Sequence, residues 1–147
     1  MQSNLIAVLA AIASVAVAQQ TSKPDFTGTW KVLAESGKSA ETDIIEQTGS
    51  TFTITPILAS GNKIAPMVYP TDGTKRAQMV GAFKVLRTGH WEGTKLLLES
   101  MRDGVSPEHG MVETISLSPD GKTITRSFHV RDGKVPDHHV TLEKVRK

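Results

Sequence analysis

Short runs of β-branched, aromatic and other apolar residues alternate with glycine-containing turns along the chain after residue 27. Four of the turn glycines directly follow an aspartate, at Asp72, Asp103, Asp120 and Asp132. Asp-Gly suits tight hairpin turns, because glycine adopts positive φ without a steric penalty and aspartate tolerates it. The spacing predicts about eight or nine consecutive strands. They are expected at Gly28–Glu35, Asp43–Gln47, Thr51–Ile57, Lys63–Tyr69, Met79–Thr88, Lys95–Met101, Gly110–Ser118, Lys122–Arg131 and His138–Val145.

A helical apolar period is not sustained for three turns anywhere after the N-terminal run. At most a short helix fits Leu33–Ala40, where Gly37 argues against it. The pattern therefore predicts an all-β fold, an up-and-down antiparallel β-barrel or half-open meander. Closure into a barrel would remove exposed strand edges.

The N-terminal segment Leu5–Ala18 is apolar throughout apart from Ser14, and it closes on Ala16-Val17-Ala18. An apolar run of this length before a small-x-small triplet is typical of a secretory signal peptide, and it is shorter than the roughly 20 residues of a membrane span. We expect cleavage after Ala18, which leaves residues 19–147 as one secreted or periplasmic domain. The alternative is a buried N-terminal helix, which the lack of a polar face disfavours.

The amino-acid composition limits the kinds of site that the chain can form. The chain has no cysteine, which excludes disulfides, thiol catalysis and cysteine-based metal sites. Its net charge of +2 comes from mixed signs, which is not the footprint of a nucleic-acid-binding protein. The five histidines have no chelating spacing, and no nucleophile elbow or phosphate-binding loop is present. We therefore predict no metal, no cofactor and no catalytic residue, and a binding protein rather than an enzyme.

The hairpin Gly110–Arg131 allows a register to be predicted. If Asp120-Gly121 forms a two-residue turn, Glu113 lies opposite Phe128 and Ile115 lies opposite Arg126. Side chains alternate along a strand, so both charged groups then share one face with apolar residues and reach each other diagonally. Ser118-Pro119-Asp120-Gly121 also permits a turn with Pro119 at the first corner and Gly121 in a bulge, which would slip the register and separate the pair.

A Glu113–Arg126 pair within an apolar lining has two interpretations. A structural ion pair that satisfies itself and binds nothing is the commoner case. The alternative is a cavity in which the pair orients the polar end of a ligand.

The segment Pro24-Asp25-Phe26-Thr27-Gly28-Thr29-Trp30-Lys31 resembles the Gly-x-Trp entry strand of lipocalin-like β-barrels. The rest of the chain resembles small, secreted, lipocalin-like bacterial domains. That likeness rests on Tyr69-Pro70-Thr71-Asp72-Gly73, Trp91-Glu92-Gly93-Thr94-Lys95-Leu96, the stretch from Glu113 to Ser118-Pro119-Asp120-Gly121-Lys122, and a last strand ending Leu142-Glu143-Lys144. The resemblance implies that Trp30 closes one end of a barrel that holds a small apolar ligand. Family members often carry a late arginine over this tryptophan, for which Arg126, Arg131 and Arg146 are the candidates here.

These observations lead to one hypothesis and two rivals. The first is an exported protein that binds a small apolar or amphipathic molecule, with no nucleic-acid partner and no membrane span. The second is a non-enzymatic envelope interaction module whose barrel is filled by its own side chains and which shows an exposed apolar patch or strand edge elsewhere. The third is a hydrolase or isomerase of calycin-like shape. Core packing is the default role for each aromatic residue. The candidate interior binding residues are Trp30, Phe52, Phe83, Trp91, Glu113, Arg126 and Phe128.

Overall fold

The computed structural model describes residues 22–33 and 42–146 of the chain. Within them the chain is all-β, with ten strands and one short 3-10 helix. The elements are β1 (Gly28–Val32), β2 (Thr42–Gln47), β3 (Thr51–Ile57), β4 (Met67–Pro70), β5 (Arg76–Val80), β6 (Phe83–Glu92), β7 (Lys95–Arg102), η1 (Pro107–His109), β8 (Met111–Leu117), β9 (Thr123–Val130) and β10 (His138–Lys144).

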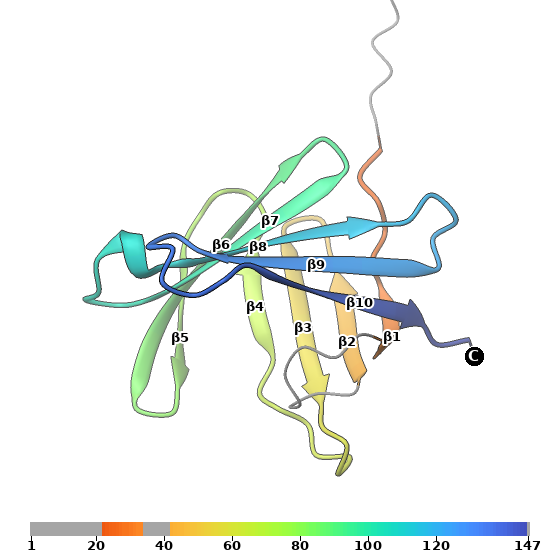
Figure 1. Cartoon of the computed structure of the whole chain (residues 1–147), viewed down its shortest axis with the longest axis horizontal. Coiled ribbons are helices and arrows are strands. Elements are labelled where there is room, and N and C mark those ends of the chain that lie inside the picture. The colour runs from red at the N-terminus through yellow and green to blue at the C-terminus, as the bar shows by residue number, and fades with distance from the viewer. Residues whose placement is uncertain (1–21, 34–41, 147) are drawn as a thin grey trace, which may run out of the picture.

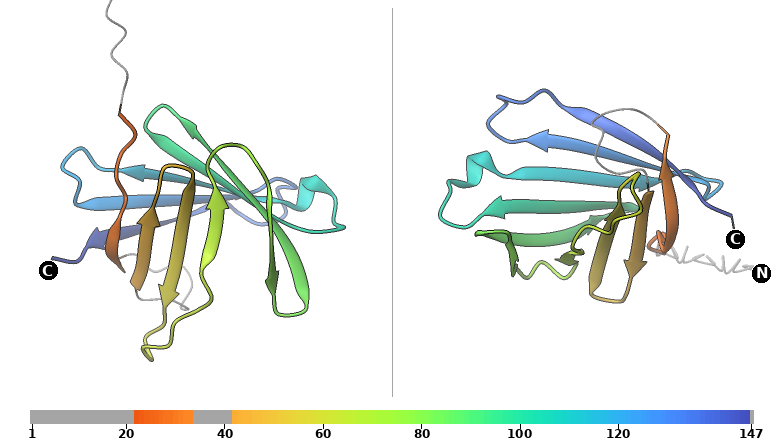
Figure 2. Two further views of the ribbon diagram at one scale, coloured as in Figure 1. Left: turned by 180° about the vertical axis from the view of Figure 1, so that it is seen from behind. Right: turned by 90° about the horizontal axis from the view of Figure 1, so that it is seen from below.

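All ten strands belong to one antiparallel sheet in the order β4-β3-β2-β1-β10-β9-β8-β7-β6-β5. Consecutive strands are neighbours except for β4 and β5, which form the two edges, and β1 joins the two halves of the sheet by pairing with both β2 and β10. The sheet curls round so that β4 comes back towards β5 and β6, as Figures 1 and 2 show. The predicted fold class is confirmed: the protein is a nearly closed up-and-down β-barrel.

A side chain completes the barrel where the backbone ladder stops. Gln78 of β5 donates from Nε2 to the carbonyl oxygen of Pro66 (2.6 Å), and its Oε1 accepts from the backbone N–H of Val68 in β4 (3.4 Å). Further along, the backbone N–H of Gly73 donates to the carbonyl oxygen of Gly89 in β6. The Gln78 side chain therefore links β4 to β5, and the Gly73–Gly89 hydrogen bond links the loop after β4 to β6.

The predicted strands agree with the structure except in two places. The single strand expected at Met79–Thr88 is wrong: β5 and β6 form a hairpin there, with Gly81 at φ +60° in the turn. Without Cβ, Gly81 reverses the chain at no steric cost, and no aspartate precedes it to mark the turn. The strand expected at Lys63–Tyr69 begins only at Met67. The possible helix at Leu33–Ala40 falls outside the described residues after Leu33.

The register of the β8–β9 hairpin is confirmed, although its turn differs from the predicted one. Glu113 pairs with Phe128 and Ile115 with Arg126. The Gly121 N–H donates to the Ser118 carbonyl, so Pro119 stands at the first corner, as the alternative had it. The Ser118 N–H also donates to the carbonyl of Thr123, which makes the loop four residues long, Pro119–Lys122. The even loop length preserves the side-chain alternation and hence the shared face.

The two ends of the barrel differ. At the end near Trp30, the segment before β1 buries one side chain in the barrel: Phe26 is fully buried, packs edge-to-face on Phe52 (ring centroids 5.8 Å apart) and stacks on Trp91. We call this the aromatic end. The opposite end carries the β5–β6 turn and the loop containing η1, and we call it the hairpin end. Fully buried aromatic rings thus close the aromatic end with side chains.

Candidate functional site inside the barrel

Three charged side chains meet inside the barrel. The Arg126 guanidinium of β9 donates from Nε to Glu113 Oε1 of β8 (2.5 Å) and from Nη1 to Asp43 Oδ2 of β2. Asp43 and Glu113 are each 2% exposed and Arg126 is 9% exposed. The predicted contact between Glu113 and Arg126 is present, and sequence reasoning missed Asp43, the second carboxylate.

Asp43 and Glu113 neutralise the Arg126 guanidinium, so this arginine needs no further anionic partner. Burial works to lower the pKa of Arg126, but Glu113 first and Asp43 next outweigh it, so the pKa is raised and the cation is fixed. Burial raises the pKa of Asp43; the Arg126 guanidinium offsets part of that rise, and the neighbouring Glu113 adds to it. The triad therefore contains two acidic side chains and one basic side chain. Arg126 has no unpaired positive charge with which to bind an anionic ligand.

Arg87 of β6 presents the opposite situation. It is 6% exposed, and within the described residues no carboxylate lies within ion-pair distance of it. Its Nη1 donates to Gln78 Oε1 (2.6 Å), while its buried Nε–H has no hydrogen-bond partner in that part of the chain. A buried cation with an unused donor is costly, because both the charge and the N–H have lost water.

Two hydroxyl groups lie near Arg87. The Tyr69 hydroxyl is 3.0 Å from Ser100 Oγ, and the Arg87 Cζ lies 5.6 Å from the centre of the Tyr69 ring. Burial, together with the Glu113 charge, raises the pKa of Tyr69, although Ser100 and Arg87 counteract part of the shift. Tyr69 is therefore protonated at neutral pH and can donate a hydrogen bond. A guanidinium and two hydroxyls form a donor set suited to a carboxylate or another small anion.

The strand register places this donor set on the inner face towards the hairpin end. Arg87 pairs with Ser100, Ser100 with Met111 and Met111 with Val130, so these four side chains form one rung across four strands. The next rung inward contains Gly89, Leu98, Glu113 and Phe128. Arg87 thus lies one rung nearer the hairpin end than Glu113.

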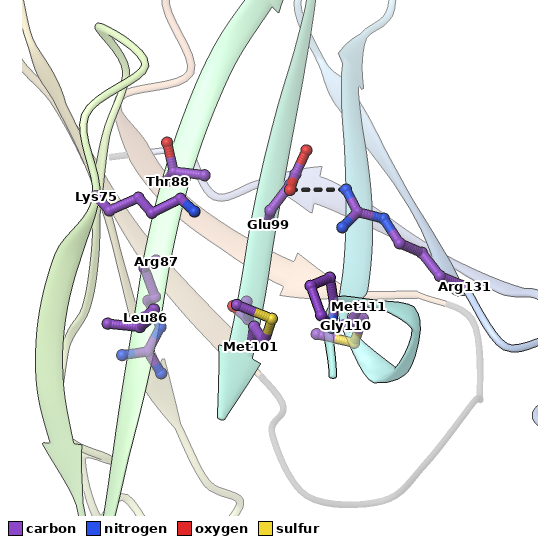
Figure 3. A pocket seen from close by; sticks show the side chains of 11 residues that line it. Lys75, Leu86, Arg87, Thr88, Glu99, Met101, Gly110, Met111 and Arg131 are labelled. Atoms are coloured by element: carbon purple, nitrogen blue, oxygen red, sulfur yellow. Dashed lines mark ion pairs between the residues drawn. The ribbon is translucent and has the colours of Figure 1, made fainter. Parts of the chain in front are cut away.

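A small cavity lies on the outer face of the sheet, behind the Arg87 backbone. Its volume is about 80 Å³, and its lining includes Arg131 together with Leu86, Thr88, Glu99 and Met101, which alternate along the strands with the inward-facing Arg87 and Ser100. Figure 3 shows that Glu99 and Arg131, joined by an ion pair of 2.7 Å, lie on one side of this cavity, while the Arg87 guanidinium points away from them. Small-molecule sites usually measure about 300–1,000 Å³. Because this small cavity lies on the outer face, it is separate from the donor set of Arg87, Tyr69 and Ser100.

The seven residues predicted from the sequence do not form one site. Trp30 and Phe52 are fully buried in the core at the aromatic end. Trp91 is half-buried, stacks on Phe26 and has Lys23 Nζ at 5.5 Å from its ring centre. Phe128 is half-buried, stacks on His138 and lies 5.2 Å from Arg126 Cζ. The interior position expected for Phe83 is wrong: it is 47% exposed, because the Gly81 turn places it at the tip of the β5–β6 hairpin.

Trp30 does occupy the place that the resemblance implied. Its Nε1–H donates to the Phe26 carbonyl oxygen (2.8 Å), which ties the segment before β1 to the core. The cation over its ring is Lys144 of β10, with Nζ at 5.2 Å, and not one of the three candidate arginines.

In residues 22–33 and 42–146, no three histidine or acidic side chains are grouped closely enough to bind a metal ion. His90, His109 and His129 each lie within hydrogen-bond distance of a carboxylate instead, namely Glu92, Asp132 and Asp137. None of the described helices is long and apolar enough to cross a membrane.

No protein-family model and no curated protein matches the sequence. Among solved structures, the chain is similar to one described as "REP1-NXSQ fatty acid transporter", with a TM-score of 0.60. The match covers 82% of this chain and 96% of that chain at 10% sequence identity. The chain has a lipocalin-like fold. At this identity the likeness extends to the fold alone.

Arg87 was missed by the sequence analysis, but a signal for it exists. Val85, Arg87, Gly89 and Trp91 alternate along β6, which places one arginine among apolar neighbours on a single face. The same argument identified Glu113 and Arg126 on their hairpin.

Proposed function

We propose that this protein binds a small amphipathic molecule whose anionic group is held by Arg87. The observation that carries the proposal is the buried Arg87 guanidinium, which has neither a carboxylate partner nor an acceptor for its Nε–H among residues 22–33 and 42–146. A bound anion would supply both the missing charge and the missing acceptor. The likeness of the fold to a fatty acid transporter supports this proposal and makes a long-chain carboxylate the first ligand to test.

The surroundings of Arg87 fit such a molecule. The Tyr69 and Ser100 hydroxyls supply further donors next to Arg87. Met111, on the same rung, and Val85, two residues along β6, provide apolar surface next to the donor set. In this proposal, Glu113 and Arg126 have a structural role, because Asp43 and Glu113 already neutralise the arginine.

Binding can be tested by titration calorimetry with palmitate and with hexadecanol, which differ only in the charged head. Palmitate is expected to bind the wild-type protein and to bind Arg87→Met at least about tenfold more weakly, since a hydrogen bond to a charged group contributes about 1.5–3 kcal/mol. Arg131→Met, at an exposed arginine that pairs with Glu99 outside the barrel, is the matched control and should bind palmitate like the wild type. Equal affinity of wild type and Arg87→Met for palmitate would contradict the proposal.

A second candidate function is favoured by a different observation. The core at the aromatic end is filled by the protein's own side chains, including the fully buried Phe26, Trp30 and Phe52. A filled barrel suits an interaction module that uses its outer surface. Absence of binding to palmitate, hexadecanol and lipid extracts would favour this second function.

We also propose that the chain is exported, on the strength of the apolar run Leu5–Ala18. Expression of the full chain in a bacterium, followed by mass measurement of the mature product, tests this. A mature chain that begins at Gln19 outside the cytoplasm is expected, and an intact cytoplasmic chain would refute export.

A further inference from the structure

The tip of the β5–β6 hairpin exposes apolar side chains. Met79 is 61% exposed, Val80 46% and Phe83 47%. Seven large hydrophobic side chains are exposed among the described residues, and these three lie within five positions of one another. In Figure 1 the tip of the β5–β6 hairpin projects from the body of the barrel at the lower left. Clustered exposed apolar residues on a small protein commonly mark an interaction surface.

Two basic side chains lie next to this tip. The Arg102 guanidinium at the end of β7 lies 3.7 Å from the centre of the Phe83 ring. Lys84, the next residue along β6, pairs with Asp103 (2.5 Å). Within the described residues, Arg102 forms no ion pair. Arg102 therefore gives the surface beside the apolar tip a positive charge.

We propose that the tip formed by Met79, Val80 and Phe83 inserts into the surface of an anionic lipid bilayer, with Arg102 and Lys84 contacting the lipid head groups. This goes beyond the ligand binding proposed above and does not require a bound ligand. Apolar side chains flanked by cations match the boundary between acyl chains and anionic head groups.

The size of the tip favours a bilayer over a protein partner. A stable protein interface buries about 800 Å² on each side, contributed by about 20–30 residues. Three half-exposed side chains on a narrow hairpin are too few for such an interface. Insertion into a bilayer needs no complementary partner surface, and each side chain contributes independently through its buried area.

The strand pattern connects the tip with the barrel interior. Phe83, Val85 and Arg87 alternate along β6 and therefore lie on one face, from the exposed tip to the buried arginine. Arg102 pairs with Val85, so its guanidinium lies on the same face between the tip and Arg87. A docked tip would bring this strip of β6 next to the bilayer surface.

Vesicle co-sedimentation with the full mature chain tests the docking. Vesicles of phosphatidylcholine mixed with phosphatidylglycerol are compared with vesicles of phosphatidylcholine alone. Wild-type protein is expected to sediment with the mixed vesicles and to be released by salt. Val80→Ser and Phe83→Ser should each weaken partitioning by about fivefold or more, and Arg102→Gln by about fivefold.

Val135→Ser is the matched control for Val80→Ser. Val135 is also a valine and has a similar exposure, 48% against 46% for Val80, but it lies in the loop between β9 and β10. Val135→Ser should partition like the wild type. Because all these positions are exposed, thermal unfolding of each variant should match the wild type and exclude misfolding. Arg87→Met should keep vesicle binding, which separates docking from the proposed ligand site.

Three results would overturn the proposal. Wild-type protein that stays in the supernatant with mixed vesicles shows that the tip does not bind anionic lipid. An equal loss with Val135→Ser and Val80→Ser shows that the effect is not specific to the tip. A wild-type dimer in solution that Val80→Ser converts to a monomer, without vesicle binding, assigns the tip to self-association along the open edge of β5.

Discussion

The carbonyl oxygen of Pro70 lies so close to Gly89 that a Cβ atom at Gly89 would be 3.1 Å from it. This contact brings the end of β4 onto β6, across the place where the backbone ladder of the barrel is interrupted. The absence of a side chain at position 89 is therefore what allows the two edges of the sheet to approach.

Gly89→Ala is expected to loosen this closure. The added Cβ would also meet the Leu97 carbonyl oxygen at 3.3 Å and Leu98 Cδ2 at 2.9 Å, and the two backbone oxygens cannot rotate away. Overpacking of this kind costs about 1–3 kcal/mol of unfolding free energy, measurable by urea denaturation. Gly49→Ala, where nothing lies within 4 Å, is the control and should leave stability nearly unchanged. Equal stability of the two variants would argue against the steric account.

Arg126→Met should destabilise the protein strongly. The substitution leaves Asp43 and Glu113 buried together without a cation, a situation that costs about 3–5 kcal/mol. Arg131→Met, which breaks the partly exposed ion pair with Glu99, should cost only about 0–1 kcal/mol. Denaturation curves of the two variants at neutral pH measure the difference, and similar losses would contradict the buried role of the triad.

Asp43→Asn should change how stability depends on pH. Because the pKa of Asp43 is raised above 3.8 in the folded state, the folded protein binds more protons than the unfolded chain between 3.8 and that raised pKa. The stability contributed by Asp43 is thus greatest at low pH and falls as pH rises through this window. Asparagine can still accept from Arg126 but does not titrate. Wild type should therefore lose stability relative to Asp43→Asn as pH increases above about 4, and the opposite slope in urea midpoints would refute this.

Trp30→Phe should lower the free energy of unfolding by more than the loss of buried ring area alone would do. The fully buried Trp30 donates its Nε1–H to the Phe26 carbonyl, which phenylalanine cannot do. A buried acceptor left without a partner costs about 1–3 kcal/mol. Trp91→Phe, at the half-buried tryptophan that stacks on the same Phe26, is the comparison and should be milder. Thermal unfolding of both variants measures the difference between their losses of stability.

The sequence predicted what depends on local turns and alternation. The Glu113–Arg126 contact spans 13 positions and one hairpin, so a correct register was enough to place it. The predicted pairing is correct although the predicted turn type is wrong, because the actual loop, Pro119–Lys122, also has an even number of residues. Gly81 was missed because the turn lies between apolar residues, Val80 and Phe83, and lacks the polar neighbours of the other turns.

Contacts that depend on barrel closure were beyond sequence reasoning. Asp43 is 83 positions from Arg126, and only the curling of the sheet brings β2 opposite β9. The same holds for Tyr69 and Arg87, which approach each other across the interrupted edge between β4 and β5. The isolation of Arg87 from carboxylates likewise becomes visible only once every neighbouring strand is in place.

The position of Tyr69 gives the protein a built-in optical probe. It is the only tyrosine in the chain, so the ultraviolet difference absorbance of tyrosinate arises from this residue alone. Tyr69 is 2% exposed, and the charges of Glu113 and Arg87 act on its ionisation in opposite directions, Glu113 raising its pKa and Arg87 lowering it. An alkaline titration followed by absorbance therefore reads the balance of charge in the barrel interior without any added label.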